Sequence, residues 1–230
     1  MTVAINKTSY PYHFVNEQGQ PDGLAVDLWR LWSEKTDIEV EFFAFEWPET
    51  LAKVSSGQIT VHAGMAQLGE REKDFTYFSP NYLIANHLYL HRDLTDITDI
   101  EQITPFAVGV VKGSLHVDTL KAKYPRLVLK EYASRHQLYD AALKGEVRVF
   151  AGIENLSKHY SQHDKLAAMF PPYRRLSYDH KRYGSVMAKN NPVLFSFIQQ
   201  GLNQVTPQEL VQIERKWLGM NKQKGVISLA

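Results

Sequence analysis

Short apolar segments alternate with amphipathic segments along most of the chain, and this alternation is the feature that most restricts the fold. Leu24, Leu28 and Leu31 recur at helical spacing, which predicts a helix with one buried face. Strands that alternate with helices are typical of α/β layering, in which helices cover a sheet. The expected strands are Val3–Ile5, Glu39–Phe43, Ile59–Ala63, Phe106–Val111, Leu127–Lys130 and Val147–Ala151.

The last part of the chain departs from this alternation. Pro192–Val205 and Pro207–Trp217 are predicted as two consecutive helices, each with a proline in its first turn, where the missing N–H costs nothing. No Gly- or Ser-rich linker divides the chain, so two lobes would be joined by ordered crossings. The other expected helices are Leu24–Glu34, Pro48–Val54, Ser114–Lys123 with Ser114 as a possible N-cap, Arg135–Leu143 and Asn155–Gln162.

Composition excludes several classes of function. The 230 residues are 44% hydrophobic, enough for one large domain or two small lobes, and the net charge of +1 gives no support for binding nucleic acid or anionic membranes. No apolar run is long enough to span a bilayer. With no cysteine, disulfides and thiol catalysis are excluded. The nine histidines form no zinc motif, so we expect neither a metal nor a cofactor.

The two ends of the chain are also informative. Met1 leads directly into the first expected strand, so no signal peptide is visible and we expect a leader to have been removed. Gly225–Ala230 resembles Thr2–Ile5. Two interpretations remain open: an ordinary C-terminal strand, or the start of a second copy of the same module.

Three stretches carry a family resemblance. The first is an aromatic and proline loop, a glycine turn and a helix start, at Tyr10–Phe14, Asn16–Gly19 and Gly23–Leu28. The second comprises Gly57–Ile59, Ala63–Met65, Glu70-Arg71 and Phe75–Tyr82, and the third runs from Tyr183-Gly184 through Asn191-Pro192 to Lys216–Gly219. In this order they resemble the family 3 periplasmic solute-binding proteins, whose best-known members bind polar amino acids.

The resemblance implies an α/β periplasmic-binding-protein, or Venus-flytrap, fold of two mixed-sheet lobes joined by two hinge crossings. Lobe 1 would comprise residues 1–87 plus 186–230, and lobe 2 residues 88–185. The crossings would lie near His87–Leu90 and Gly184–Met187. Closure about the hinge would bury a small solute in the cleft.

The same resemblance assigns a ligand-gripping role to Arg71. In the family this position clamps the α-carboxylate of the ligand, and a planar guanidinium suits the task because it offers two parallel N–H donors. The alternative is a surface salt bridge with Glu70 or Glu72.

Further candidates surround Arg71 in the family pattern. Ser114 and Leu115 open a helix whose backbone amides would bind the same carboxylate, unless Ser114 is a plain N-cap. Tyr10 and Trp47 would form aromatic walls, although most tryptophans belong to the core. His62 lies close to the expected loop and would either reach the cleft or stay buried with satisfied hydrogen bonds.

Several positions depart from the amino-acid-binding pattern. Ala66 stands where the family has a hydroxyl residue, Asn6 replaces an aspartate of the first strand, and Ile153 stands in place of the aspartate that pairs with the ammonium group. An unpaired buried ammonium costs several kcal/mol. Either the neighbouring Glu154 supplies the lost charge, or the ligand lacks an amine.

The favoured function is the periplasmic sensory domain of a membrane signalling protein, because "VHAGM" and "RVFAG" resemble sensor versions of the family. Its partners would be a small carboxylate or amino acid and an attached signalling domain. The alternative is a free periplasmic protein serving an ABC amino-acid permease. We expect no enzyme; a dehydratase-like activity would need Glu154 as its acid, and no paired carboxylates or activated nucleophile supports it.

Overall fold

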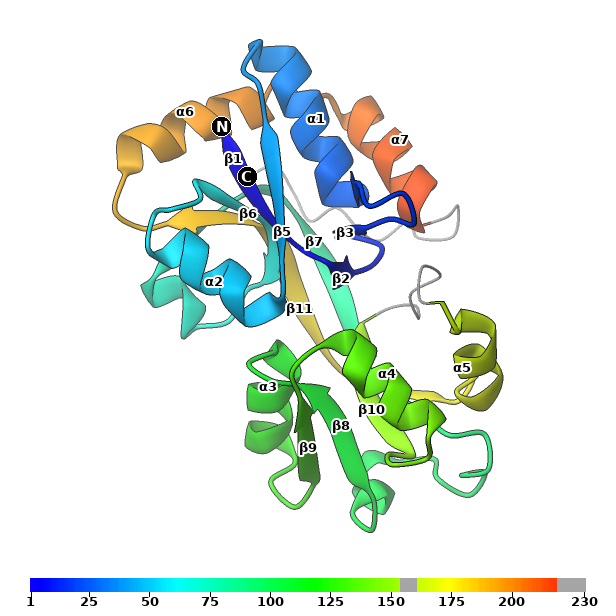
Figure 1. Ribbon diagram of the computed structural model, residues 1–230. Coiled ribbons are helices and arrows are strands. Elements are labelled where there is room, and N and C mark those ends of the chain that lie inside the picture. The colour runs from blue at the N-terminus through cyan, green and yellow to red at the C-terminus, as the bar shows by residue number, and fades with distance from the viewer. Residues whose placement is uncertain (154–160, 219–230) are drawn as a thin grey trace. The chain divides into compact units, whose positions relative to one another are not determined.

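The computed structural model describes residues 1–153 and 161–218 (Figure 1). The chain folds into two compact units. Unit 1 comprises residues 1–83 and 181–230, and unit 2 comprises residues 84–180. The chain therefore changes unit twice, a few residues earlier in each case than the boundaries that the family resemblance implies.

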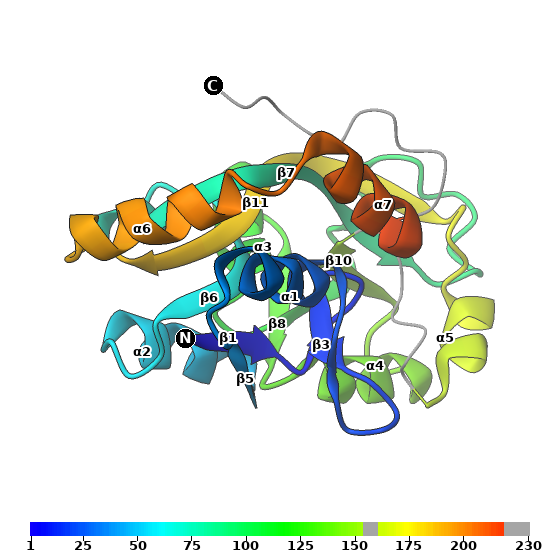
Figure 2. The ribbon, with the colours of Figure 1, turned by 90° about the horizontal axis from the view of Figure 1, so that it is seen from above.

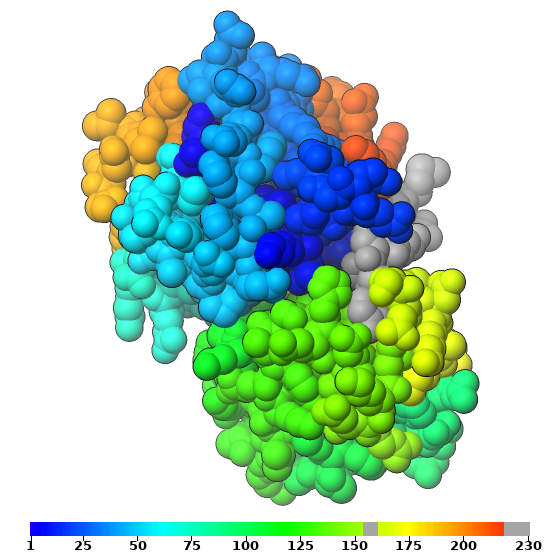
Figure 3. Space-filling model, in the orientation of Figure 1, coloured from blue at the N-terminus to red at the C-terminus, as the bar shows by residue number. Residues whose placement is uncertain are grey.

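The sheet of unit 1 is built around its first strand. β1 (Thr2–Asn6) lies between two parallel neighbours, β5 (Glu41–Phe45) and β6 (Val61–Ala66). The last part of β11 (Arg175–Ala188) adds an antiparallel strand beside β6, with Tyr183 opposite Ala66. Val3, Ala4 and Ile5 are each 0% exposed, and in the space-filling view the dark blue of the first residues shows only in small areas (Figure 3). β1 is thus a central, buried strand, as its apolar sequence predicts.

Helices cover both faces of this sheet (Figures 1 and 2). Val3 and Ile5 of β1 pack with α1, α6 and α7, whereas Ala4 faces the cluster that includes Val54 of α2. This alternation follows from the period of two residues in a strand. The helices are α1 (Leu24–Thr36), α2 (Trp47–Ser55), α6 (Pro192–Leu202) and α7 (Pro207–Leu218).

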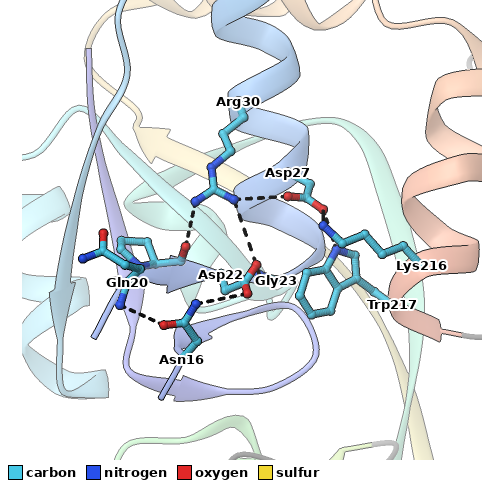
Figure 4. A network of polar contacts seen from close by, with 9 residues as sticks. Asn16, Gln20, Asp22, Gly23, Asp27, Arg30, Lys216 and Trp217 are labelled. Carbon is cyan, nitrogen blue, oxygen red and sulfur yellow. Dashed lines mark hydrogen bonds and ion pairs between the residues drawn. The ribbon is translucent and has the colours of Figure 1, made fainter. Parts of the chain in front are cut away.

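A polar network ties α7 to α1 (Figure 4). Asp27 of α1 accepts hydrogen bonds at Oδ2 from Lys216 Nζ and Trp217 Nε1, both at 2.7 Å. Its Oδ1 accepts a third, from Arg30 Nη1 at 3.3 Å. The aspartate of the helix-start motif therefore holds the returning end of the chain against α1.

A small three-stranded sheet follows β1 in unit 1. It consists of β2 (Thr8–Ser9), β3 (His13–Val15) and β4 (Pro21–Asp22). Strands of two or three residues are too short to show a period, so the sequence pattern does not predict them. This sheet carries the aromatic residues of the loop 10–14, of which Tyr12 and Phe14 are each 1% exposed.

Unit 2 has a mixed sheet in the order β7–β10–β8–β9. β10 (Val149–Ile153), β8 (Ala107–Val111) and β9 (Val128–Tyr132) are parallel, and β7 (Phe75–Leu90) runs antiparallel to β10. α3 (Leu115–Lys123) packs on one face, and α4 (Arg135–Leu143) with α5 (His163–Met169) packs on the other. Two 3₁₀ turns, Arg71–Lys73 and Ile100–Ile103, complete the elements described.

The long strands β7 and β11 are the largest elements that the sequence pattern failed to predict. The chain passes between the units inside each of them, between Leu83 and Ile84 and between His180 and Lys181. Pro80 lies inside β7. Because proline argues against a strand interior, the local sequence does not predict this strand. The expected helix Asn155–Gln162 falls largely outside the described residues, as does the expected strand Gly225–Ala230, and α5 was not predicted.

Candidate ligand-binding site

Arg71 follows the end of β6 and opens the 3₁₀ turn Arg71–Lys73. The residue is 9% exposed, and its Nη1 donates a hydrogen bond to the carbonyl oxygen of Ala66 at 3.1 Å. The hydroxyl of Tyr77 donates to the same oxygen at 2.9 Å. Ala66 therefore takes part through its backbone, and it helps to orient the buried guanidinium.

The indole of Trp47, the first residue of α2, lies against this guanidinium. The carbon Cζ of Arg71 is 5.1 Å from the centroid of the Trp47 ring, a distance at which a cation is attracted to an aromatic face. A guanidinium can donate hydrogen bonds to an anion from the edges of its plane while an aromatic ring lies near its face. Tyr10, the other aromatic candidate, is half-buried and packs edge-on against Phe14 at 5.2 Å. Burial raises the pKa of the Tyr10 hydroxyl.

Two buried histidines hold the peptide groups of Gly64, at the place where β6 leaves its neighbour β1. His62 Nδ1 accepts a hydrogen bond from the Gly64 N–H at 3.1 Å, so the ring proton of His62 lies on Nε2. This Nε2 donates to Thr50 Oγ1 at 3.0 Å, and Thr50 in turn donates to the carbonyl oxygen of Trp47 at 2.6 Å. Both ring nitrogens of His62 thus have partners within the protein.

His13 holds the other side of Gly64. The backbone N–H of Asn6 donates to His13 Nδ1 at 2.9 Å, and the side-chain oxygen of Asn6 accepts from the N–H of Thr8 at 3.1 Å. The proton of His13 therefore lies on Nε2, which faces the Gly64 carbonyl at 2.9 Å and the hydroxyl of Tyr183 at 2.7 Å. Asn6, predicted as a candidate contact, has a backbone and side chain that shape the turn from β1 to β2.

Both histidines are fully buried and neutral. Burial lowers the pKa of His13 to about 4 and that of His62 well below its usual value. The positive charge of Arg71 contributes to the second shift, after burial and the influence of His13. The neutral ring of His62 can therefore lie near the arginine without opposing its charge.

In unit 2, Ser114 and Leu115 lie at the start of α3. Ser114 occupies the N-cap position, but its side chain makes no capping hydrogen bond. Its hydroxyl oxygen is buried and has no hydrogen-bond partner among the described residues. Ser114 therefore stands at the predicted N-cap position, but its side chain does not cap the helix. Leu115 is 8% exposed, as is Ile153 at the end of β10.

The remaining candidate, Glu154, lies outside the described residues. Within unit 1 the structure brings together Arg71, Trp47, Ala66 and His62. Sequence reasoning missed Tyr77 and Tyr183 as neighbours of this cluster, although both lie in the stretches that carry the family resemblance. In the described part of the chain, no group of three or more His, Cys, Asp or Glu residues is placed to hold a metal ion.

A family model described as bacterial extracellular solute-binding proteins, family 3, matches residues 1–220. The chain belongs to this family. Among curated proteins, it is 22% identical over 151 residues to the probable amino-acid-binding protein YxeM of Bacillus subtilis (strain 168). That match covers 64% of this chain and 57% of the length of YxeM.

Solved structures show the same fold. A histidine kinase sensor domain with similarity to periplasmic binding proteins superposes with a TM-score of 0.82 at 19% identity, over 95% of this chain and 96% of that one. The ancestral amino acid-binding protein AncCDT-1, described as a precursor of cyclohexadienyl dehydratase, gives 0.79 at 18% identity, over 94% of each chain. At these identities the likeness establishes the two-lobed periplasmic-binding-protein fold. None of the helices in the described ranges meets the length and apolarity that a membrane span requires.

Proposed function

We propose that this chain binds a small carboxylate-bearing solute and that Arg71 is the partner of the carboxylate. The buried guanidinium, which donates to the Ala66 carbonyl and lies over the Trp47 ring, carries this proposal. A preformed and largely dehydrated arginine loses little freedom on binding, and its pair with an anion gains strength when water is excluded. The positive end of α3 at Ser114 and Leu115 supports an anionic ligand as well.

We further propose that the chain acts as a periplasmic sensory domain, whose closure on the solute changes the balance between two states of an attached membrane signalling domain. The fold of the histidine kinase sensor domain supports this proposal. The alternative, a binding protein that delivers amino acids to an ABC importer, is supported by the likeness to YxeM. The coding sequence around these residues separates the two, because a downstream membrane helix with a signalling domain would exclude the importer role.

Catalysis is the least supported function, because the family is one of solute-binding proteins. Because AncCDT-1 is described as a precursor of a dehydratase, dehydratase activity is the enzymatic function to test. Turnover of prephenate-like or arogenate-like substrates that is lost in Glu154→Gln would establish an enzyme in place of a binding protein.

A thermal-shift screen tests the proposed function most simply. Amino acids, other small carboxylates and short peptides are added to the wild-type protein, to Arg71→Ala and to Arg92→Ala, whose side chain is 61% exposed. A ligand at 100 times its dissociation constant stabilises the folded state by about 2.7 kcal/mol, which is readily seen. We expect Arg71→Ala alone to lose the shift. Hits that bind equally well to all three proteins would contradict the assignment of Arg71.

A further inference from the structure

Asn86 is a fully buried amide in β7 for which the protein supplies no partner among the described residues. The residue is 0% exposed, and neither its Oδ1 nor its Nδ2 makes a hydrogen bond. A buried amide without partners costs free energy, because both atoms lose their hydrogen bonds to water on folding. Buried polar groups without a partner are few in native proteins, and each needs an explanation such as a strained backbone, a functional role or a bound molecule.

The strand register shows where this amide lies in unit 2. Asn86 is paired directly with Ile153, the last residue of β10. Directly opposed residues in an antiparallel pair share one face of the sheet. Leu88 and Ala151, each two residues further along, belong to the cluster that packs under Val117 of α3. Asn86 and Ile153 therefore face the side of the sheet that α3 covers.

Ser114 lies at the same edge and on the same face. β8 and β10 are parallel neighbours, so their carboxyl ends meet at one edge of the sheet, and Ser114 follows the end of β8 to open α3. Its hydroxyl is the second buried polar group at this edge without a partner among the residues described. The carboxyl edge of parallel strands is where α/β sheets bind ligands, and a helix N-terminus there favours an acceptor over a cation.

The chemistry of this pair differs from that of an ammonium site. Ile153 stands where the family pattern places an aspartate, and its neighbour on the sheet is an uncharged amide. An amide and a hydroxyl can each donate to an oxygen and accept from a hydroxyl group, but neither neutralises a buried positive charge. The positive end of α3 would repel an ammonium further.

We propose that Asn86, with Ser114, recognises an uncharged oxygen of the ligand, so that the solute is a hydroxy or oxo carboxylate and not an α-amino acid. This inference rests on the proposed function, because the carboxylate itself is assigned to Arg71. It adds a specificity-determining residue, Asn86, in the strand that crosses between the units, and it accounts for two orphaned polar side chains at once.

Matched pairs of probes test the inference. Isothermal titration calorimetry compares lactate with alanine, malate with aspartate, 2-hydroxyglutarate with glutamate, and phenyllactate with phenylalanine. The two members of each pair have the same absolute configuration. In every pair that binds, we expect the hydroxy acid to bind at least tenfold tighter. Tighter binding of the amino acid would overturn the inference, because the ammonium group would then have an acceptor.

Two substitutions of Asn86 distinguish ligand recognition from a purely structural role. Asn86→Leu keeps the size of the side chain and removes its polar atoms, so we expect at least tenfold weaker hydroxy-acid binding with an unchanged or higher melting temperature of the unliganded protein. Asn86→Asp should shift preference toward the amino acid of the pair. Asn191→Leu is the control, because Asn191 Oδ1 accepts from the N–H of Leu194 at 2.9 Å and its loss should lower the melting temperature alone.

The outcomes separate the two proposals. Amino-acid binding that depends on Arg71 and is unaffected by Asn86→Leu would overturn this inference and leave the proposed function standing. If Asn86→Leu lowers the melting temperature and leaves the hydroxy-acid affinity unchanged, the amide has a structural role only, and this inference is overturned as well. The absence of any Arg71-dependent carboxylate binding would overturn both.

Discussion

His13 donates a hydrogen bond from Nε2 to the carbonyl oxygen of Gly64, 2.9 Å away, although 51 residues separate the two in the chain. β1 pairs with β6 only at Val61 and His62. Further along β6, the bond from His13 and the bond from Gly64 N–H to His62 take the place of pairing with β1. The strand that leads to Ala66 and Arg71 is therefore held by two neutral imidazoles. This arrangement links the protonation of two buried rings to the geometry of the proposed carboxylate site.

Acid should destabilise the protein through these histidines. The pKa of His13 is about 4 in the folded state, below the ordinary histidine value of 6.5, so the unfolded chain takes up a proton first as the pH falls. The stabilisation is complete above pH 6.5 and decreases as the pH falls toward 4. Urea unfolding at about pH 7 and about pH 4.5 should show a loss of about 2 kcal/mol from this residue. In His13→Gln the loss should be smaller by that amount; an equal loss in both proteins would contradict the account.

Gly64→Ala should be strongly destabilising. A Cβ at Gly64 would meet the ring of Tyr183, which itself is held by His13. Overpacking of this kind costs about 1–3 kcal/mol. Gly69→Ala is the matched control, because a Cβ there has no heavy atom within 4 Å, and its midpoint of urea unfolding should stay close to that of the wild type. Equal midpoints for the two variants would show that the strand adjusts freely.

Asp27→Ala should loosen the attachment of α7. The substitution removes the acceptor of both Lys216 and Trp217, and the Asp27 side chain is only 15% exposed. We expect the free energy of unfolding to fall by about 1–3 kcal/mol. Glu34→Ala changes an exposed acid on the same helix and should stay within about 0.5 kcal/mol. A double-mutant cycle with Trp217→Phe should give a coupling energy clearly above zero, and additive effects would exclude the contact as a source of stability.

Local patterns predicted most elements but not the polar contacts around the site. Helical spacing placed Arg135–Leu143 at the bounds that α4 has, and the apolar run Val3–Ile5 lies inside β1. Glu39–Phe43 was placed two residues early, because Glu39 and Val40 continue the alternation although β5 begins at Glu41. Strand ends depend on the partner strand, which a local pattern does not contain.

The candidate site shows the same limit. The family resemblance predicts Arg71 as a ligand contact, and in the structure this residue is buried beside Trp47. No sequence pattern indicates that Asn86 is buried without a partner, because this depends on strand β10, more than sixty residues later in the chain. Hydrogen bonds between distant residues, such as Trp29 to Ser185 at 3.1 Å, likewise arise only from the folded arrangement.

The most direct test of the account pairs Arg71 with the carboxylate of its ligand. A carboxylate identified in the screen and its primary amide are each titrated calorimetrically into the wild-type protein and Arg71→Ala. We predict that the wild type prefers the acid by about 2 kcal/mol or more and that Arg71→Ala loses most of this preference, since a charge-assisted pair is worth about 1.5–3 kcal/mol. If the variant distinguishes acid from amide as well as the wild type does, Arg71 does not bind the carboxylate and the central claim is wrong.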